Sequence, residues 1–305
     1  MNSKNIAKSL NAKLTYWVKT IEDEEVQRAV KNDAMITGGA LVSLLNGEKP
    51  NDYDVYFKTL ETCRLVAEYY AKQWNITHKL KVEIRDHDNP NENDQKRIEC
   101  FIKSSGVAKD ENETGIDDSS EEIQNEEPYV TENEENPTEE NPEIKKPKYR
   151  PRYFTTNAIS LSDSIQLVIR FWGPVEEIHK NYDFEHCKCS YDWKENKVDL
   201  PVKALECIIN KELVYNGSRY PLCSIIRTRK FLQRGYHINA GQYVKMALDL
   251  NELDLSDFTV FKDQLMGVDS AYFSAVLEYL QKRREEDETF NPDKHYIFEI
   301  INRIF

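Results

Sequence analysis

Two pairs of residues near the N-terminus have the types and the spacing to handle a phosphorylated substrate and a cation together. Gly38 and Gly39 stand just ahead of an apolar segment, residues 40–45, which predicts a short helix. Glycines at a helix start let a phosphate approach the backbone, where free N–H groups and the helix dipole favour an anion. Asp52 and Asp54 follow on a segment that alternates acidic with apolar and aromatic residues, which predicts a strand.

The two aspartates are separated by one residue, so their carboxylates point to the same face of the predicted strand. Two neighbouring carboxylates favour a cation between them, and Mg²⁺ takes few carboxylates while leaving room for substrate phosphates. Either motif alone is common in proteins without such a site. Together, joined by a short turn, they predict a Mg²⁺ or Mn²⁺ site that faces a cradle for an NTP.

The elements that must position this site predict an α/β (α+β) fold, with a mixed sheet and flanking helices. Residues 1–200 form the expected head and residues 201–305 a helical C-terminal region. Strands are predicted over residues 34–37, 52–57, 79–85, 97–103, 149–160, 164–172 and 182–189. Helices are predicted over residues 4–31, 59–74, 175–180, 202–211, 221–234 and 240–250, with further helices to the C-terminus.

One acidic block interrupts the predicted head. Residues 110–143 contain 15 Asp and Glu and no Lys or Arg, whereas the whole chain has a formal net charge of −13. The rest of the chain is therefore close to neutral, and the net charge does not exclude a nucleic-acid partner. Residues 104–147 hold almost no large apolar side chains, so we expect this insertion to be disordered.

Composition favours a cytoplasmic protein. The sequence has no apolar run near 18 residues, and its N-terminus lacks the apolar core of a signal peptide. Six scattered cysteines favour reduced thiols over a disulfide framework. Cys187 and Cys189 are predicted as core thiols, because Cys-x-Cys lacks the usual spacing of zinc ligands and no second pair matches it.

The segment from Thr37 to Asp54 resembles the head signature of the DNA polymerase beta nucleotidyltransferase superfamily. Its closest likeness is to tRNA CCA-adding enzymes and bacterial poly(A) polymerases, although Val42 and Ser43 stand where that branch has Arg-Asp. The resemblance implies metal-dependent transfer of NMP from an NTP, with Asp52 and Asp54 as metal ligands and catalytic residues.

A second segment, residues 157–187, resembles nucleotidyltransferase-like proteins of large viruses and phages. In those proteins the last strand supplies a third metal carboxylate, and this role falls on Asp183. Glu99, between apolar neighbours on a predicted strand, is the alternative that the CCA-adding likeness suggests. A phage source would place the protein in the host cytoplasm.

The substrate-binding residues are predicted in two groups. Thr37, Gly38, Gly39 and Ser43 would contact the β- and γ-phosphates of the NTP. Arg227, Arg229 and Lys230 form a basic cluster on a predicted helix and would bind a triphosphate or an RNA backbone. Nearby aromatic residues could stack on a base but are more often core residues; they are Tyr215, Tyr220, Phe231 and Tyr236.

These observations predict a two-metal nucleotidyltransferase that binds an NTP such as ATP and acts on an RNA 3′ end such as that of a tRNA. NMP transfer to a protein is an alternative within the same enzyme class. A non-catalytic module that binds nucleotide or RNA is a third reading, against which the intact Asp52 and Asp54 argue. No membrane partner is expected.

Overall fold

A computed structural model gives the fold of the chain. It describes residues 2–87, 95–103, 107–109, 148–265, 282–283, 285–287 and 294–304. The expected disorder of residues 104–106 and 110–147 lies outside the described residues. Residues 107–109, which belong to the same predicted insertion, instead form a short strand.

An eight-stranded mixed sheet forms the centre of the molecule, in the order β10-β9-β1-β2-β8-β7-β6-β5. Only the central pair β2 and β8 is parallel, and every other neighbouring pair is antiparallel. The α/β class predicted from the sequence is confirmed. The strands of this sheet are β1 (Ala34–Thr37), β2 (Tyr53–Phe57), β5 (Val107–Lys109), β6 (Pro151–Thr155), β7 (Ala158–Leu161), β8 (Ile165–Trp172), β9 (Ser190–Asp192) and β10 (Lys197–Asp199).

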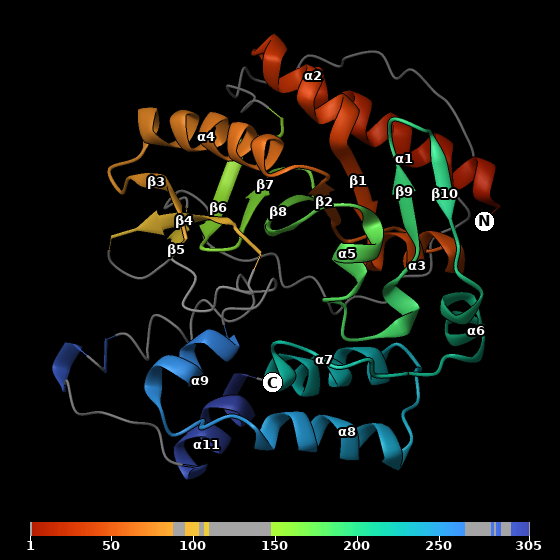
Figure 1. Ribbon diagram of the computed structural model, residues 1–305, viewed down its shortest axis with the longest axis vertical. Coiled ribbons are helices and arrows are strands. Elements are labelled where there is room, and N and C mark those ends of the chain that lie inside the picture. The colour runs from red at the N-terminus through yellow and green to blue at the C-terminus, as the bar shows by residue number, and fades with distance from the viewer. Residues whose placement is uncertain are drawn as a thin grey trace, which may run out of the picture.

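Three helices cover one face of the sheet: α1 (Ser3–Val18), α2 (Glu24–Asp33) and α4 (Leu60–Thr77). Figure 1 shows them as one layer above the strands. Their apolar stripes pack on Ile36, Val55 and Leu167, which alternate with residues of the opposite face. A two-stranded sheet of β3 (Val82–Asp86) and β4 (Ile98–Ile102) packs beside α4.

The opposite face holds a smaller apolar group around Met35, Tyr56 and Val168, covered by α5 (Val175–His179) and by Tyr220. Helices of the C-terminal region lie on this side (Figure 1). They are α6 (Val202–Asn210), α7 (Pro221–Gln233), α8 (Ala240–Asn251), α9 (Phe258–Leu265) and α11 (Lys294–Ile304). Asp54 and Gln166 lie on this face, because each is two residues from Tyr56 or Val168 along its strand.

The helix α3 (Gly39–Asn46) joins β1 to β2 and places the two predicted motifs together. Residues 40–44 are all buried, so the short helix is held by its apolar side chains. It ends at Gly47, which adopts the left-handed conformation that favours glycine. The order strand, Gly38, helix, turn, strand is the one predicted from the sequence.

The prediction of a strand over residues 182–189 is wrong. Phe184 makes only an isolated bridge to Tyr215, and residues 185–187 form a 3₁₀ turn, η1 (Glu185–Cys187). The turn closes through Lys188 N–H, which donates to the Glu185 carbonyl at 3.1 Å, and the two side chains form an ion pair at 2.9 Å. This local pairing bends the chain where alternation alone indicated an extended strand.

The hairpin of β9 and β10 and the strand β5 were not predicted. Each of these strands spans only three residues, too short for a clear alternation. Asn196, in the turn of the hairpin, has φ of +47°, a conformation that Asn tolerates. Within the described residues, no helix is both long and apolar enough to cross a membrane.

A buried hydrogen bond between α1 and α4 gives a test of this packing. The indole N–H of Trp17 donates to the Tyr70 hydroxyl at 2.7 Å, and both side chains are buried. Tyr70→Phe leaves a buried donor unpaired and should lower the free energy of unfolding by about 1–3 kcal/mol. Urea denaturation of the full chain measures this change.

Tyr69→Phe is the matched control. The Tyr69 hydroxyl accepts from Glu22 N–H at an exposed position, where water replaces it. Its cost should stay below about 1 kcal/mol. An equal loss of stability in the two variants would contradict the assigned packing of α1 on α4.

Candidate active site

Gly38 brings the backbone into contact with Asp54. Its φ of +94° and ψ of −145° lie in a region that residues with a side chain rarely occupy. A Cβ at this position would lie 3.4 Å from Asp54 Oδ2 and 3.5 Å from the Tyr182 hydroxyl oxygen. A Cβ on Gly39 would meet nothing within 4 Å. The first turn of α3 thus adjoins one carboxylate on one side and open space on the other.

The two predicted metal carboxylates sit at the start of β2. Asp54 is half-buried, and its Oδ1 accepts a hydrogen bond of 3.1 Å from Gln166 Nε2 on β8. Asp52 precedes the strand and is exposed. The parallel register pairs Asp54 with Gln166, which explains why this amide reaches the carboxylate. A half-buried and an exposed carboxylate beside a helix start suit a hard cation that also binds phosphate oxygens.

The wall of the site is a hydrogen-bonded group of Thr37, His179 and Cys189, of which only Thr37 was predicted as a site residue. The buried Thr37 hydroxyl donates to the Cys189 carbonyl at 2.9 Å and lies 2.8 Å from His179 Nε2. Burial, and after it Lys188, lowers the pKa of His179 to about 4, so the imidazole is neutral near pH 7. The Thr37 side chain therefore holds the wall together, and its predicted contact with phosphate stays a prediction.

Tyr182 faces the same carboxylate from the wall. Burial is the main cause that raises the pKa of its phenol well above the usual value, and Tyr56 and Asp54 act in the same direction. The hydroxyl therefore stays protonated beside Asp54. The hydroxyl lies against Gly38, and Tyr182 is followed directly in the chain by Asp183.

The structure places Asp183 against α7. Its buried carboxylate accepts from Ser224 Oγ at 3.0 Å and forms an ion pair with Arg227. Among the described residues, no group of three or more His, Cys, Asp or Glu side chains could hold a metal ion. The structure therefore does not bring Asp52, Asp54 and Asp183 into one metal-binding group, and a metal role for Asp183 stays a prediction.

The alternative residue, Glu99, lies on β4 in the separate two-stranded sheet. Its carboxylate binds His87 Nδ1 at 2.6 Å. The CCA-adding likeness placed an acidic strand residue near this position, and β4 is indeed a strand. Both candidate third carboxylates therefore have a protein side chain as partner: His87 binds Glu99, and Arg227 binds Asp183.

The remaining predicted site residues are spread over α3 and α7. Ser43 is buried one turn after Gly39 on α3. Arg227 is bound to Asp183, whereas Arg229 and Lys230 are exposed on α7. Among the aromatic candidates, Tyr215 and Tyr236 are core residues. The structure thus unites Gly38 with Asp54 and Tyr182, and Arg227 is bound to Asp183, the next residue after Tyr182.

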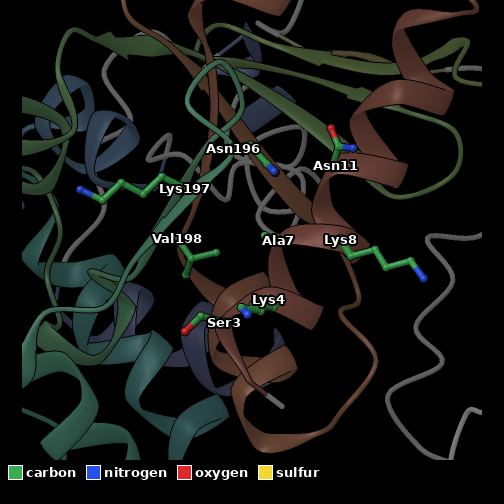
Figure 2. Close-up of a pocket in the computed structure, with 8 residues that line it drawn as sticks. All are labelled: Ser3, Lys4, Ala7, Lys8, Asn11, Asn196, Lys197 and Val198. Atoms are coloured by element: carbon green, nitrogen blue, oxygen red, sulfur yellow. The ribbon is translucent and has the colours of Figure 1, made fainter.

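A cavity of about 460 Å³ lies elsewhere, between the first turns of α1 and the β9–β10 hairpin (Figure 2). Three lysines line it, but Lys8 and Lys197 point away from one another in Figure 2. None of the predicted site residues lines this cavity. It is therefore separate from the site built around Gly38.

Three solved structures resemble the fold at low identity. The Thermotoga maritima CCA-adding enzyme complexed with tRNA_CCA has a TM-score of 0.37 and 11% identity, over 83% of this chain and 49% of the enzyme. A CCA-adding enzyme with CTP has a TM-score of 0.36 and 12% identity, over 82% and 49%. A tRNA-processing enzyme with CTP has a TM-score of 0.36 and 12% identity, over 84% and 57%.

Comparisons of sequence give the family. A curated relative from Bacillus phage SPbetaL7, "Gabija anti-defense 2", is 22% identical over 271 residues, which cover 88% of this chain. The match covers 49% of that relative, so the chain spans about half of its length. The model of the family described as "Gabija anti-defense 2 family protein" matches residues 8–211, about two thirds of the chain. The chain therefore belongs to the Gabija anti-defense 2 family.

Proposed function

We propose that this protein is a metal-dependent nucleotidyltransferase that moves NMP from an NTP to an acceptor hydroxyl. The observation that carries the proposal is the close approach of Gly38 to Asp54: a Cβ added at Gly38 would lie 3.4 Å from Asp54 Oδ2. A glycine-led helix start offers N–H groups to a phosphate, and the carboxylate lies directly beside it. Few functions other than binding a metal–phosphate pair need both groups at one point.

In the reaction, the acceptor oxygen forms a bond to the α-phosphorus, the bond to the bridging oxygen breaks, and pyrophosphate leaves. Mg²⁺ or Mn²⁺, held by Asp52 and Asp54, would neutralise charge on the phosphates and lower the pKa of the acceptor hydroxyl, whose proton would pass to solvent water. Gly38 and Gly39 present backbone N–H groups to the phosphates. Gln166 fixes the orientation of Asp54 through its 3.1 Å hydrogen bond.

Asp183 has a positioning role in this account. Its ion pair with Arg227 and the hydrogen bond that it accepts from Ser224 tie α7 to the segment that carries Tyr182. The contact between Thr37 Oγ1 and His179 Nε2, at 2.8 Å, stabilises the wall of the site. Ser43, Arg229 and Lys230 remain proposed contacts for the substrate on the basis of their places in the sequence.

An RNA 3′ end is the proposed acceptor, and a polypeptide is the rival. The near-neutral charge outside the acidic block is compatible with RNA. The name of the phage relative, Gabija anti-defense 2, favours a protein of a bacterial defence system as the rival acceptor. A non-catalytic module is disfavoured because it has little use for the exposed Asp52.

The central experiment combines the protein with Mg²⁺, each of the four α-labelled NTPs, and total RNA. Label should enter RNA with wild-type protein and fall to background with Asp52→Asn/Asp54→Asn, since each substitution removes a charge that binds metal. The variant Glu195→Gln/Glu206→Gln removes two exposed carboxylates elsewhere and should match the wild type.

Label in protein alone would overturn the RNA acceptor and support the polypeptide rival. Absence of label in RNA and in protein, with the wild type folded by circular dichroism, would contradict the proposed activity. Equal labelling by the wild type and the aspartate variant would contradict the assigned site.

A glycine comparison tests the close approach itself. Gly38→Ala adds a methyl group against Asp54 and should reduce transfer on the order of 100-fold, because small displacements of reacting groups are costly. Gly47→Ala also strains a backbone of positive φ (+81°) but meets no atom within 4 Å. It should keep nearly full specific activity in the folded protein.

Thermal denaturation checks that both glycine variants are folded. If Gly38→Ala does not fold, Asp54→Asn alone serves in its place, since it keeps the shape of the side chain and removes its charge. Wild-type activity in a folded Gly38→Ala or in Asp54→Asn would contradict the proposal.

A further inference from the structure

Within the described residues, β10 is the outermost strand of the eight-stranded sheet, and it pairs with β9 on one side only. In Figure 1 it lies beside the first turns of α1. An edge strand presents backbone N–H and C=O groups to which a further strand can bind. The described sheet therefore ends on a strand that another extended segment could join.

The hydrogen bonds of β9 show which residue of β10 directs its backbone outward. Trp193 N–H donates to the Ala34 carbonyl at 3.2 Å, so Asp192, one residue earlier, directs its N–H and C=O toward β10. Asp192 is paired there with Lys197. Because this direction alternates along a strand, the N–H and C=O of Val198 point away from β9. No described residue donates to or accepts from these two groups.

A cavity of about 460 Å³ lies beside this outward-facing residue (Figure 2). Val198 lines the cavity from the hairpin, and its side chain is half-buried. The lining residues on α1 recur at the spacing of one helix flank; they are Ser3, Lys4, Ala7, Lys8 and Asn11. The cavity thus separates the edge strand from one flank of α1.

The flank of α1 carries positive charge. Lys4 and Lys8 are exposed, and neither forms an ion pair with a described residue. The helix has no Asp or Glu along its length. In the hairpin, Glu195 and Asp199 lie outside the lining of the cavity, and Asp199 alternates with Val198 and so points to the other face of the strand. The charge of the flank favours an acidic partner.

An extended peptide fits this combination of a strand edge, a cavity and a basic flank. In strand addition, main-chain hydrogen bonds provide affinity, and alternate side chains provide specificity. A peptide residue opposite Val198 would donate to its carbonyl and accept from its N–H. Its side chain would enter the cavity toward Ala7, and carboxylates of neighbouring residues would meet the lysines. A phosphodiester backbone offers no donor to the Val198 carbonyl, so it fits less well.

We propose that the edge of β10 binds an extended acidic segment of a partner protein as an added strand, with Lys4 and Lys8 contacting its carboxylates. The surface is separate from the proposed active site, because neither lysine nor Val198 belongs to that site. The inference therefore does not depend on the transfer of a nucleotide.

Fluorescence anisotropy of the full chain tests the surface with a labelled short peptide of alternating Glu and Val. The peptide should bind, and added salt should weaken its binding because the lysines are exposed. A peptide of alternating Lys and Val reverses the charge, and one of alternating Glu and Pro lacks the N–H groups opposite β10. Each should bind at least about tenfold more weakly. Equal binding of the three peptides, or no binding of the first, would overturn the proposal.

A proline on the edge strand tests the backbone contact. Val198→Pro removes the outward N–H but no hydrogen bond to β9, so the hairpin should persist. Binding of the Glu–Val peptide should fall to background. Val198→Thr is the matched control, since it keeps the N–H and the branched shape, and it should bind nearly as the wild type does. Equal binding by the two variants would contradict strand addition.

Charge reversal on α1 tests the basic flank, and it serves alone if Val198→Pro does not fold. Lys4→Glu/Lys8→Glu should weaken binding of the Glu–Val peptide on the order of tenfold, because two attractions become repulsions. Lys72→Glu/Lys245→Glu reverses two exposed charges on α4 and α8 and should bind as the wild type does. An equal loss in the two variants would show that net charge alone governs binding, which would overturn the site.

Hydrogen exchange identifies the mode of binding. The Glu–Val peptide should slow amide exchange in the segment 196–200, because the outward N–H of Val198 becomes hydrogen-bonded. Binding without this protection would contradict an added strand. Tighter binding of a labelled single-stranded RNA than of the peptide, lost in Lys4→Glu/Lys8→Glu, would assign the surface to nucleic acid and overturn the proposal.

Discussion

The close approach between Gly38 and Asp54 is the constraint on which the rest of the site depends. The backbone must turn at a φ of +94°, and the space where a side chain would begin is bounded by Asp54 Oδ2 and the Tyr182 hydroxyl. Only glycine meets both conditions without strain. The sheet supplies the rest: β1 carries Gly38 to the start of β2, and β8 brings Gln166 to the Asp54 carboxylate.

The second feature of the architecture is the buried pair of Asp183 and Arg227. Such a pair gains little net free energy over an apolar contact, but loss of one partner leaves an uncompensated charge. It therefore fixes the relative position of α7 and the wall more than it adds stability. Tyr182 adjoins Asp183 and lies against Gly38. A displacement of α7 would therefore shift Tyr182 relative to Gly38 at the proposed active site.

Much of the fold could be predicted from periodicity. The buried run of β8, the apolar helix after Gly39 and the amphipathic α4 all carry strong patterns, and each was predicted near its true bounds. The error at residues 182–189 arose because Phe184, His186 and Cys187 look like strand residues. A local ion pair and a bridge to Tyr215 decide otherwise. Three-residue strands such as β9 carry too little pattern to be predicted.

The site was predictable only in part, and for a similar reason. Gly38, Asp52 and Asp54 are close in sequence, so local spacing reveals them. Gln166 reaches Asp54 through the parallel register of β2 with β8, and His179 joins the site through its contact with Thr37. Such pairings over more than a hundred residues leave no local signal. Asp183 was singled out, but its partner Arg227 was expected to bind a substrate rather than a carboxylate.

Binding of Mn²⁺ in the presence of a non-hydrolysable NTP tests whether Asp52 and Asp54 hold the metal–nucleotide pair. Electron paramagnetic resonance measures the free ion as protein is added. We expect that wild-type protein depletes the signal, that Asp52→Asn/Asp54→Asn does not, and that Glu195→Gln/Glu206→Gln behaves as the wild type. Equal depletion by wild-type protein and the aspartate variant would show that the metal–nucleotide pair binds elsewhere, and it would contradict the site built on Gly38 and Asp54.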